Sequence, residues 1–293
     1  MPLTHIPSFE KPVTAKEISP IQWEVLRCVI AERYGFRLHD SWAGQVVARL
    51  SERATATGRS GIDDYLQWLL NPTTPADEMP MLVESLLNGE THFLRTEPHF
   101  SALINTVVPA WRATRSPGQH LRIVSLGCST GEEPYSIALV LHEILSKDEL
   151  ACLEVTGVDV SKKSLAVAKA GRYESYQLRE LTPLQRQRWF SAAKDKWVID
   201  PALCASIRFF QHNLLEPLPF AGLDVIFCRN VLIYFRRVAV EFCYLEFHMA
   251  LRPGGYLFLG HSESAFGYPE YFEPVQVRDG VIYQNKPSYN SFS

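Results

Sequence analysis

A short segment from Ile123 to Ser136 constrains the fold of this chain more than any other. Its sequence, I-V-S-L-G-C-S-T-G-E-E-P-Y-S, passes from a β-branched apolar run through a glycine loop into an amphipathic helix. Glycine is favoured where a chain turns sharply off a buried strand and where backbone must approach a ligand, and Gly127 and Gly131 stand at those two places. The pattern predicts a strand–loop–helix corner that binds a nucleotide cofactor, although an ordinary strand-to-helix turn would look the same.

The start of this helix separates two classes of cofactor. A pyrophosphate site has G-x-G-x-x-G spacing and small residues where phosphates meet the helix N-terminus. Here the spacing is G-x-x-x-G, and the helix begins with Glu132 and Glu133. Two carboxylates would repel a phosphate but attract the amino group of an amino-acid-like ligand. S-adenosylmethionine meets that requirement.

Length, charge and hydropathy narrow the class of protein. A chain of 293 residues exceeds an average domain, so we expect one large or two unequal domains. Its formal net charge of −3 and pI of about 6.3 argue against a nucleic-acid partner. No run approaches the ~20 apolar residues of a membrane span, and residues 1–12 lack the apolar region of a signal peptide. We therefore expect a cytoplasmic protein without membrane insertion.

The cysteines and histidines show no metal-ligand spacing. The six cysteines are dispersed and form no C-x-x-C pair, which argues against both a zinc site and a disulfide framework. The nine histidines likewise form no ligand pair. We expect no metal site.

The first part of the chain has helical periodicity. Ser19, Pro20 and Gln22 match an N-cap, a first helical position and the third residue of a capping box. The expected buried face of this helix consists of Ile21, Val25, Leu26, Val29 and Ile30. Further helices are expected over residues 42–54, 62–70, 77–87 and 98–111.

Beyond Ser116-Pro117-Gly118, short apolar runs alternate with helical patterns, as in a parallel sheet covered by helices. Asp279-Gly280 indicates a hairpin turn near the end of the chain. The predicted strands cover residues 121–126, 153–158, 207–212, 223–228, 256–259, 272–277 and 281–285. The expected fold class is therefore α/β, with a mostly parallel sheet, an antiparallel edge hairpin and a small all-α domain before it.

Three polar residues follow predicted strands, at the edge where ligands gather in an open α/β sheet. Asp159 is placed to accept hydrogen bonds from ribose hydroxyls, Asn213 offers the donor and acceptor of an adenine edge, and Asn230 would line the central cleft. Asp159 and Asn230 could instead be helix N-caps, and Asn213 a turn residue.

Together, these segments resemble the CheR family, the methyltransferases that methylate glutamate side chains of bacterial chemoreceptors. The resemblance covers nearly the whole chain. The matching motifs are T-H-F-L-R at 91–95, S-T-G-E-E-P-Y-S at 129–136, V-T-G-V-D-V at 155–160, H-N-L at 212–214, F-C-R-N-V-L-I-Y-F at 227–235 and L-R-P-G-G-Y-L-F-L-G-H-S-E-S at 251–264. The resemblance implies a Rossmann-like, S-adenosylmethionine-dependent methyltransferase fold.

The resemblance also implies which residues contact the cofactor or its product, S-adenosylhomocysteine. Together with Gly127 of the glycine loop, they are Thr91, Arg95, Glu132, Glu133, Asp159, Asn213, Leu214, Asn230 and Val231. Which glutamate of the pair makes the contact stays open. The family often has Asn two residues before the threonine, whereas this chain has Gly89 there and Asn88 one step earlier.

The expected domains follow from the same reasoning. Residues 1–88 would form a helical domain for receptor recognition, and residues 89–118 a linker helix that contributes to the cofactor site. Residues 119–293 would form the methyltransferase domain, with a small insertion around 174–206. A non-catalytic, S-adenosylmethionine-sensing adaptor is the alternative to an enzyme. A nucleic-acid or small-molecule methyltransferase would need a basic face or a Pro-Cys or N-P-P-Y motif, and neither is found.

Methyl transfer to a glutamate needs no general base, because a carboxylate with a pKa near ~4.3 is already ionised at neutral pH. The task of the enzyme is then to position the carboxylate against the methyl group. We expect Arg95 to steer the carboxylate and Tyr234 to shape the methyl pocket. The alternatives are a structural ion pair for Arg95 and a core aromatic for Tyr234.

The expected partner is the cytoplasmic helical domain of a methyl-accepting chemoreceptor, bound by a monomer. Arg49 and Arg53 lie four apart on one predicted helix and could meet its acidic methylation helix, or they could form a solvated face with Glu52. Some family members dock a receptor's carboxyl-terminal peptide on a small β insertion. Residues 190–207 contain no glycine for a tight hairpin, so we expect receptor recognition without such a tether.

Overall fold

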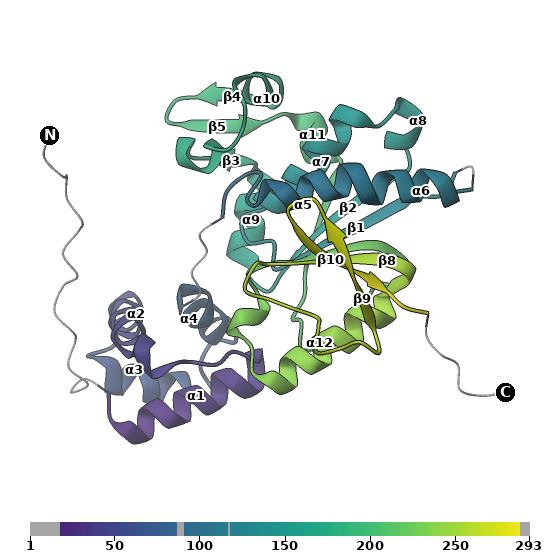
Figure 1. Cartoon of the computed structure of the whole chain (residues 1–293). Helices are drawn as coiled ribbons and strands as arrows, with labels where there is room; N and C mark the ends of the chain where they lie inside the picture. Colours follow the sequence, from purple (N-terminus) through teal and green to yellow (C-terminus); the bar gives the residue numbers. More distant parts are fainter. Residues whose placement is uncertain (1–17, 87–90, 117, 288–293) are drawn as a thin grey trace, which may run out of the picture. The chain divides into compact units, whose positions relative to one another are not determined.

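The computed structural model describes residues 18–86, 91–116 and 118–287. The chain divides into two compact units, residues 1–88 and 89–293 (Figure 1). The N-terminal residues 1–12 and the Asn88–Gly89 departure from the family pattern lie outside the described residues.

The first unit is helical, as predicted. Its helices are α1 (Pro20–Tyr34), α2 (Ala43–Ala56), α3 (Ile62–Leu69) and α4 (Glu78–Leu86). The capping box of α1 is confirmed, because Ser19 Oγ accepts from the Gln22 amide at 3.2 Å and Gln22 Oε1 accepts from the Ser19 amide at 2.8 Å. Both residues of this reciprocal pair lie within four consecutive positions. The local sequence is therefore sufficient to determine where α1 begins.

The predicted buried face of α1 is only partly right. Leu26 and Ile30 are buried, but Ile21 is 78% exposed and Val25 is also exposed. Trp23 takes their place, since its indole packs inward and donates to Asp40 Oδ1 at 3.0 Å. The buried face of α1 therefore contains positions 23, 26 and 30.

An ion pair holds α2 against α4. Arg53 donates two hydrogen bonds to the Glu78 carboxylate, at 3.0 and 2.6 Å, and the Tyr65 hydroxyl donates a third at 2.6 Å. Glu78 is buried and the Arg53 side chain is 22% exposed. Arg53 is therefore part of the packing of this unit, which bears on the expected receptor contact.

The second unit contains a seven-stranded sheet in the order β6-β2-β1-β7-β8-β10-β9. The pairs among the first five strands are parallel, and β10 pairs antiparallel with both β8 and β9, which confirms the predicted fold class. The strands are β1 (Leu121–Leu126), β2 (Leu153–Asp159), β6 (Ile207–Gln211), β7 (Leu223–Cys228), β8 (Leu251–Leu259), β9 (Phe272–Val277) and β10 (Gly280–Asn285). Strand β8 starts at Leu251, earlier than predicted, because Leu251 pairs with Leu223 before a shift in register.

Helices cover both faces of this sheet: Figure 1 shows α6 and α7 on one side and α12 on the other. The predicted helix over residues 98–111 is a continuous run of α5 (Glu97–Ala102), a π-helical turn (Leu103–Val107) and α6 (Val108–Thr114). Pro109 lacks the N–H that an unbroken α-helix would need there, which accounts for the wider turn. The other helices are α7 (Glu132–Ile144), α8 (Lys147–Leu150), α9 (Lys162–Ala170) and α12 (Arg237–Ala250).

The insertion forms a second sheet in the order β3-β5-β4. It comprises β3 (Arg172–Tyr173), α10 (Pro183–Trp189), β4 (Phe190–Ala193), β5 (Lys196–Ile199) and α11 (Pro201–Ala205). Strands β4 and β5 are joined by a tight hairpin, with Ala193 opposite Lys196 and Lys194 at φ +54°. The expectation that a chain without glycine here would lack a tight hairpin is wrong, because Lys194 itself adopts the left-handed conformation.

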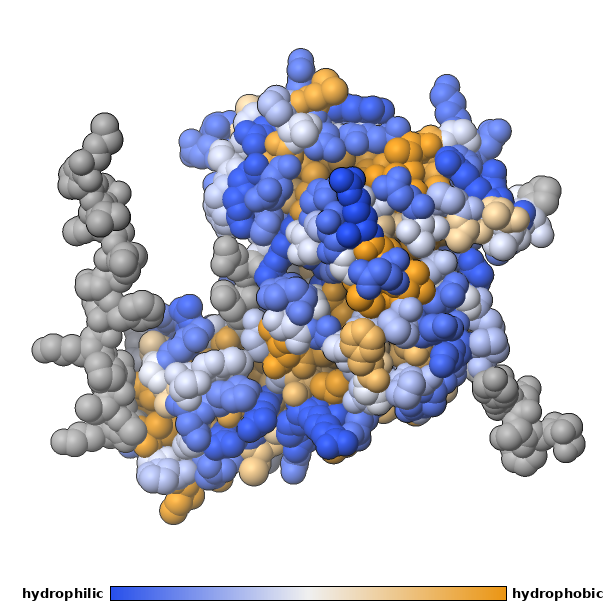
Figure 2. Space-filling view, in the orientation of Figure 1, coloured by the Kyte–Doolittle hydropathy of each residue, from blue (hydrophilic) through white to orange (hydrophobic). Residues whose placement is uncertain are grey.

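The surface mixes hydrophilic and hydrophobic residues, and on the face shown in Figure 2 the hydrophobic ones form several separate spots. In the described part of the chain, no helix is both long and apolar enough to span a bilayer.

Candidate active site

The glycine loop follows β1 and leads into α7, as predicted. Gly127 has φ +70°, and a Cβ added to it would lie 2.4 Å from Cγ2 of Val231, beyond the end of β7. Gly131 has φ +93°, and its added Cβ would lie 2.7 Å from the Ala168 side chain in α9. The two glycines therefore allow the loop to turn and let the segments after β1, β2 and β7 approach one another.

Asp159 ends β2 and orients this loop. Its Oδ2 accepts from the Ser129 amide at 2.7 Å and its Oδ1 from the Ser161 amide at 2.9 Å. The N-cap of α9 is Ser161, whose hydroxyl accepts from the Ser164 amide at 2.8 Å. The N-cap interpretation of Asp159 is therefore wrong. Its partly exposed carboxylate lies at the carboxyl edge of the sheet.

Asn213 and Asn230 follow β6 and β7 at the same edge. The Asn213 side-chain oxygen accepts from the Leu215 amide at 3.1 Å. This oxygen therefore has the contact expected of a turn residue. Leu214 beside it is buried. Asn230 has φ +58° and precedes a 3-10 turn at Leu232–Tyr234 whose N-cap is Val231. The N-cap interpretation of Asn230 is therefore wrong.

The two glutamates at the start of α7 have different environments. Glu132 is 0% exposed, and its carboxylate accepts hydrogen bonds from the Thr130 hydroxyl and the Gln177 amide. Burial raises the pKa of Glu132 above its ordinary value. The Glu133 side chain is 14% exposed, and its carboxylate accepts from Ser125 Oγ at 2.7 Å and Arg229 Nη1 at 2.9 Å. Glu132 is enclosed in the protein, whereas Glu133 reaches its surface.

Backbone contacts hold the segment from Thr91 to Arg95 in place. The Phe93 amide donates to the Gln177 carbonyl at 2.9 Å, the Leu94 amide to Ser136 Oγ at 2.8 Å, and the Arg95 carbonyl accepts from Arg229 Nη2 at 2.6 Å. Leu94 and Thr96 have positive φ values of 57° and 67°. This segment is therefore fixed against α7, the insertion and the end of β7.

Arg229 is a residue of this region that the sequence interpretation missed. Its side chain is 3% exposed and connects Glu133 with the Arg95 carbonyl. Burial lowers the pKa of Arg229, and the charge of Glu133 opposes that effect. A signal was present in the sequence, because an arginine directly after the apolar strand 223–228 has to find a carboxylate if it is buried.

The structure brings the two predicted catalytic residues into electrostatic range of each other. Burial raises the pKa of Tyr234, and the positive charge of Arg95 counteracts this. The Tyr234 side chain is partly exposed rather than enclosed in the core.

These groups match the chemistry of S-adenosylmethionine. The Asp159 carboxylate at the end of β2 can accept hydrogen bonds from hydroxyls, and the Asn213 side-chain amide follows β6. The Glu133 carboxylate, in the helix that follows β1, reaches the surface. The S-adenosylmethionine-binding domain of CheR methyltransferases matches residues 89–281. The chain belongs to the CheR methyltransferase family.

Members of this family resemble the chain over nearly its whole length. It is 32% identical over 274 residues to "Chemotaxis protein methyltransferase Cher2" of Pseudomonas putida, covering 91% of this chain and 98% of that protein. It is 33% identical over 271 residues to "Chemotaxis protein methyltransferase 1" of Pseudomonas aeruginosa, covering 90% of this chain and 97% of the relative. Among solved structures, the N-methyltransferase NodS of Bradyrhizobium japonicum, in complex with S-adenosylhomocysteine, has a TM-score of 0.39 at 14% identity, covering 65% of this chain and 87% of NodS.

Membership of the CheR family confirms three predictions: the methyltransferase class, the Rossmann-like fold and S-adenosylmethionine as cofactor. Nothing in these relationships favours the non-catalytic adaptor. Within the described residues, no group of three or more His, Cys, Asp and Glu side chains is arranged to hold a metal ion.

Proposed function

We propose that this protein transfers a methyl group from S-adenosylmethionine to glutamate side chains of methyl-accepting chemoreceptors, giving glutamate methyl esters. The similarity to chemotaxis protein methyltransferases of two Pseudomonas species supports the substrate class. The observation that carries the proposal is the match of the CheR S-adenosylmethionine-binding domain to residues 89–281, within which the Asp159 and Glu133 carboxylates lie beside the strand ends. Arg95, in the same unit, would supply a cation for a carboxylate substrate.

Within this proposal, Asp159 binds the ribose hydroxyls, Asn213 and Leu214 hold the adenine, and Asn230, Val231 and Thr91 complete the cofactor site. Gly127 makes room for the loop. We assign the contact with the amino group of the ligand to Glu133 rather than Glu132. Glu133 is partly exposed, whereas the Glu132 carboxylate is enclosed by Thr130 and Gln177.

Bound S-adenosylmethionine supplies an electrophilic methyl group on a sulfonium. The acceptor glutamate is already ionised at neutral pH, so the protein needs no base to generate the nucleophile. Arg95 attracts and orients the carboxylate, and Tyr234 limits the space around the methyl group. Oriented encounter of this kind can lower the barrier by roughly 7 to 11 kcal/mol.

We infer that the helical unit, residues 1–88, recognises the receptor. Arg49 supports this, since its side chain is 41% exposed and pairs only at the surface with Glu52, at 2.8 Å. Arg53 is less suited, because its guanidinium is engaged by buried Glu78. Charge reversal at Arg49 should raise the KM for receptor without changing cofactor affinity. We also propose that the enzyme is a monomer and acts in the cytoplasm. Sedimentation measures its oligomeric state.

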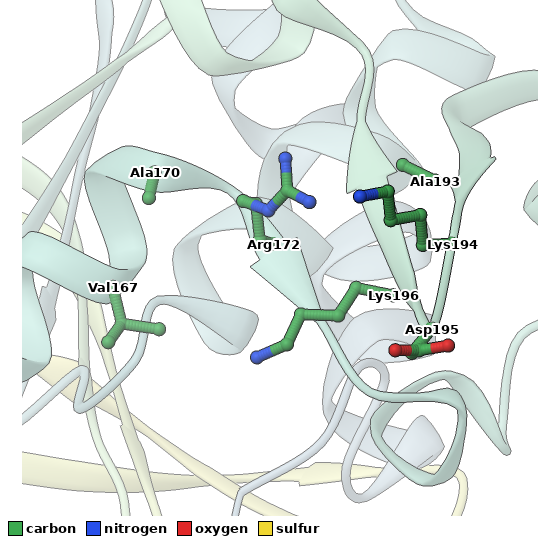
Figure 3. Close-up of a pocket in the computed structure, with 7 residues that line it drawn as sticks. All are labelled: Val167, Ala170, Arg172, Ala193, Lys194, Asp195 and Lys196. Atoms are coloured by element: carbon green, nitrogen blue, oxygen red, sulfur yellow. The ribbon is translucent and has the colours of Figure 1, made fainter.

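A pocket lined by α9 and the insertion is a candidate docking site for receptor tails. It has a volume of about 350 Å³ and is lined by Val167, Ala170, Arg172, Ala193, Lys194, Asp195 and Lys196. Figure 3 shows the charged ends of Arg172 and Lys194 pointing toward one another. Lys196 forms an ion pair with Glu174 at 3.1 Å. The prediction that the receptor is recognised without a tail peptide depended on the absence of a tight hairpin in this insertion. The hairpin between β4 and β5 is present, so the prediction no longer has that support.

Two experiments test the proposal. Incubation with labelled S-adenosylmethionine and a panel of receptor cytoplasmic domains should transfer label to receptor, and mild alkali should release it, because carboxyl methyl esters hydrolyse readily. Alkali-stable label, or label on no receptor, would contradict the proposed substrate. Fluorescence titration with receptor-tail peptides tests the insertion: micromolar binding that Lys194→Gln weakens would establish tail docking, and its absence would restore tether-independent recognition.

A further inference from the structure

Glu263 is an acidic side chain next to the candidate site whose contacts are unusual. It lies three residues beyond Gly260, which follows the end of β8. Its Oε2 accepts from the backbone amides of Gly260 at 2.6 Å and Asn230 at 2.8 Å. Its Oε1 accepts from the amides of Val231 at 2.9 Å and Leu232 at 2.7 Å. The Ile233 amide makes a longer contact with Oε1, at 3.4 Å. One carboxylate thus receives hydrogen bonds from five backbone amides of two separate segments.

These contacts explain the conformation of the segment after β7. Asn230 is a non-glycine residue at φ +58°, a conformation that costs energy unless surrounding contacts maintain it. In this conformation the amides of residues 230–232 point to the same side and form a cradle for an anion. The Glu263 carboxylate accepts from all three. The amides of Leu232 and Ile233 are the donors that the first turn of the 3-10 helix Leu232–Tyr234 leaves without helical partners, and Glu263 accepts from both.

Gly260 allows this arrangement. A Cβ added to Gly260 would lie 2.6 Å from Glu263 Oε2, 2.9 Å from the Asn230 amide nitrogen and 3.0 Å from Asn230 Nδ2. Only a residue without a side chain lets the end of β8 approach the end of β7 so closely. The two neighbouring parallel strands are therefore joined, just beyond their ends, by the side chain of Glu263.

We propose that Glu263 is a positioning residue for methyl transfer, whose carboxylate fixes the Asn230–Tyr234 segment through its backbone amides. This inference rests on the proposed function, in which Asn230 and Val231 hold the cofactor and Tyr234 shapes the methyl pocket. Glu263 acts only through this segment. Loss of its five hydrogen bonds would release Asn230 from its left-handed conformation and move Tyr234 relative to Arg95.

The test compares Glu263→Gln with the wild-type chain. Glutamine keeps the side-chain length but places an NH2 donor against backbone N–H donors. We expect kcat for receptor methylation to fall about 100-fold, the loss typical of a 1 Å displacement of reacting groups. The Kd for S-adenosylhomocysteine, measured by calorimetry, should rise roughly tenfold. The KM for receptor should stay within about twofold, because other residues bind the receptor.

Glu149→Gln is the matched control. Glu149 also accepts a backbone N–H, from Ser146 at 2.9 Å, and pairs with Arg112 at 2.8 Å, but it lies in α8, which precedes β2 and so is at the amino edge of the sheet. The Glu149→Gln variant should have a lower unfolding temperature than the wild type and nearly the same kcat. The proposal is wrong if Glu263→Gln changes kcat and Kd no more than Glu149→Gln does.

If Glu263→Gln does not fold, Glu263→Asp replaces it in the comparison with the wild-type chain and with Glu149→Gln. It keeps the charge but is one methylene shorter, so we expect an intermediate loss of kcat, about tenfold; wild-type kcat would overturn the proposal. Titration with S-adenosylhomocysteine needs no receptor. If the wild-type chain binds it but methylates no receptor, the proposed substrate fails, and the Kd comparison still decides the role of Glu263.

Discussion

Arg95 contributes two different groups to the candidate site. Its backbone carbonyl accepts from Arg229 at 2.6 Å, a contact that does not depend on the Arg95 side chain. Its guanidinium charge acts on the phenol of Tyr234. Substitution of this residue therefore removes the charge but leaves the backbone anchor, which makes Arg95 a suitable position for separating catalysis from cofactor binding.

We expect Arg95→Ala to keep the affinity for S-adenosylmethionine within several-fold and to lose most turnover, about 100-fold or more in kcat. Calorimetric titration and label transfer measure the two effects. Arg278→Ala, at an arginine that is 91% exposed in the hairpin between β9 and β10, is the control and should change neither. Abolished cofactor binding in Arg95→Ala would make Arg95 a cofactor ligand rather than a catalytic residue.

His99 makes the stability of the enzyme depend on pH. It is buried against Phe258, its Nδ1 has no hydrogen-bond partner among the described residues, and burial lowers its pKa from 6.5 to about 3, with Arg229 adding to the effect. The unfolded chain binds a proton at this residue below pH 6.5, whereas the folded chain does not until about pH 3. Stability is therefore complete above pH 6.5 and falls as the pH decreases toward 3.

We expect His99→Phe to remove this contribution. Between pH 6.5 and 4 the wild type should lose stability relative to the variant by about 1.4 kcal/mol for each pH unit. Urea unfolding at a series of pH values measures the difference. Parallel pH profiles for the two proteins would show that His99 is not the group responsible.

At the scale of elements, the hairpin between β4 and β5 is formed by residues with little intrinsic preference for its turn. Lys194 has φ +54°, a left-handed conformation that costs an L-residue roughly 1 to 2 kcal/mol. The strands supply the compensation, since Phe190 to Ala193 pair in register with Ile199 to Lys196. The packing of the insertion thus outweighs the local preference of its turn.

Lys194→Gly should therefore stabilise the protein, by about 0.5 to 1 kcal/mol in urea unfolding, because glycine adopts positive φ without a Cβ clash. Lys196→Gly is the matched control: the same substitution within β5 should destabilise by a similar amount, because glycine weakens a paired strand. A shift of the same sign in both variants would refute this account of the turn.

At the scale of the whole molecule, the methyltransferase unit has its own hydrophobic core. One buried cluster runs from Phe93 to Ile282 and includes residues of α5, α6 and α7, the sheet and the insertion, all of them within residues 89–293. This unit also contains every proposed cofactor contact. We therefore expect the folding of this unit and its cofactor binding to depend on contacts made inside it.

A chain of residues 89–293 should accordingly fold and bind S-adenosylhomocysteine with a Kd within several-fold of the full chain. It should methylate receptor with a much higher KM, because the unit proposed to recognise the receptor is missing. Calorimetry and label transfer measure these two quantities. Receptor methylation at full efficiency by this fragment would contradict the role given to residues 1–88.

The sequence by itself determined the elements whose signals are local. The predicted bounds of β1, β7 and β9 agree with the structure residue for residue, because each is a short run of strand-forming residues bounded by turn residues. The start of α1 was predictable for the same reason, since the capping box lies within four consecutive residues. The family motifs also led to the proposal of which strand ends carry the cofactor site.

Only the tertiary structure decided the partners of the charged side chains. Arg229 meets Glu133 from 96 residues away, Arg53 meets Glu78 from 25 residues away, and Glu263 meets the Asn230 segment from about 30 residues away. A periodic pattern specifies which face a side chain is on, but not which charge comes to it from another element. That choice depends on how strands and helices pack, because burial makes an unpaired charge too costly and compels each buried carboxylate or guanidinium to find its partner in space.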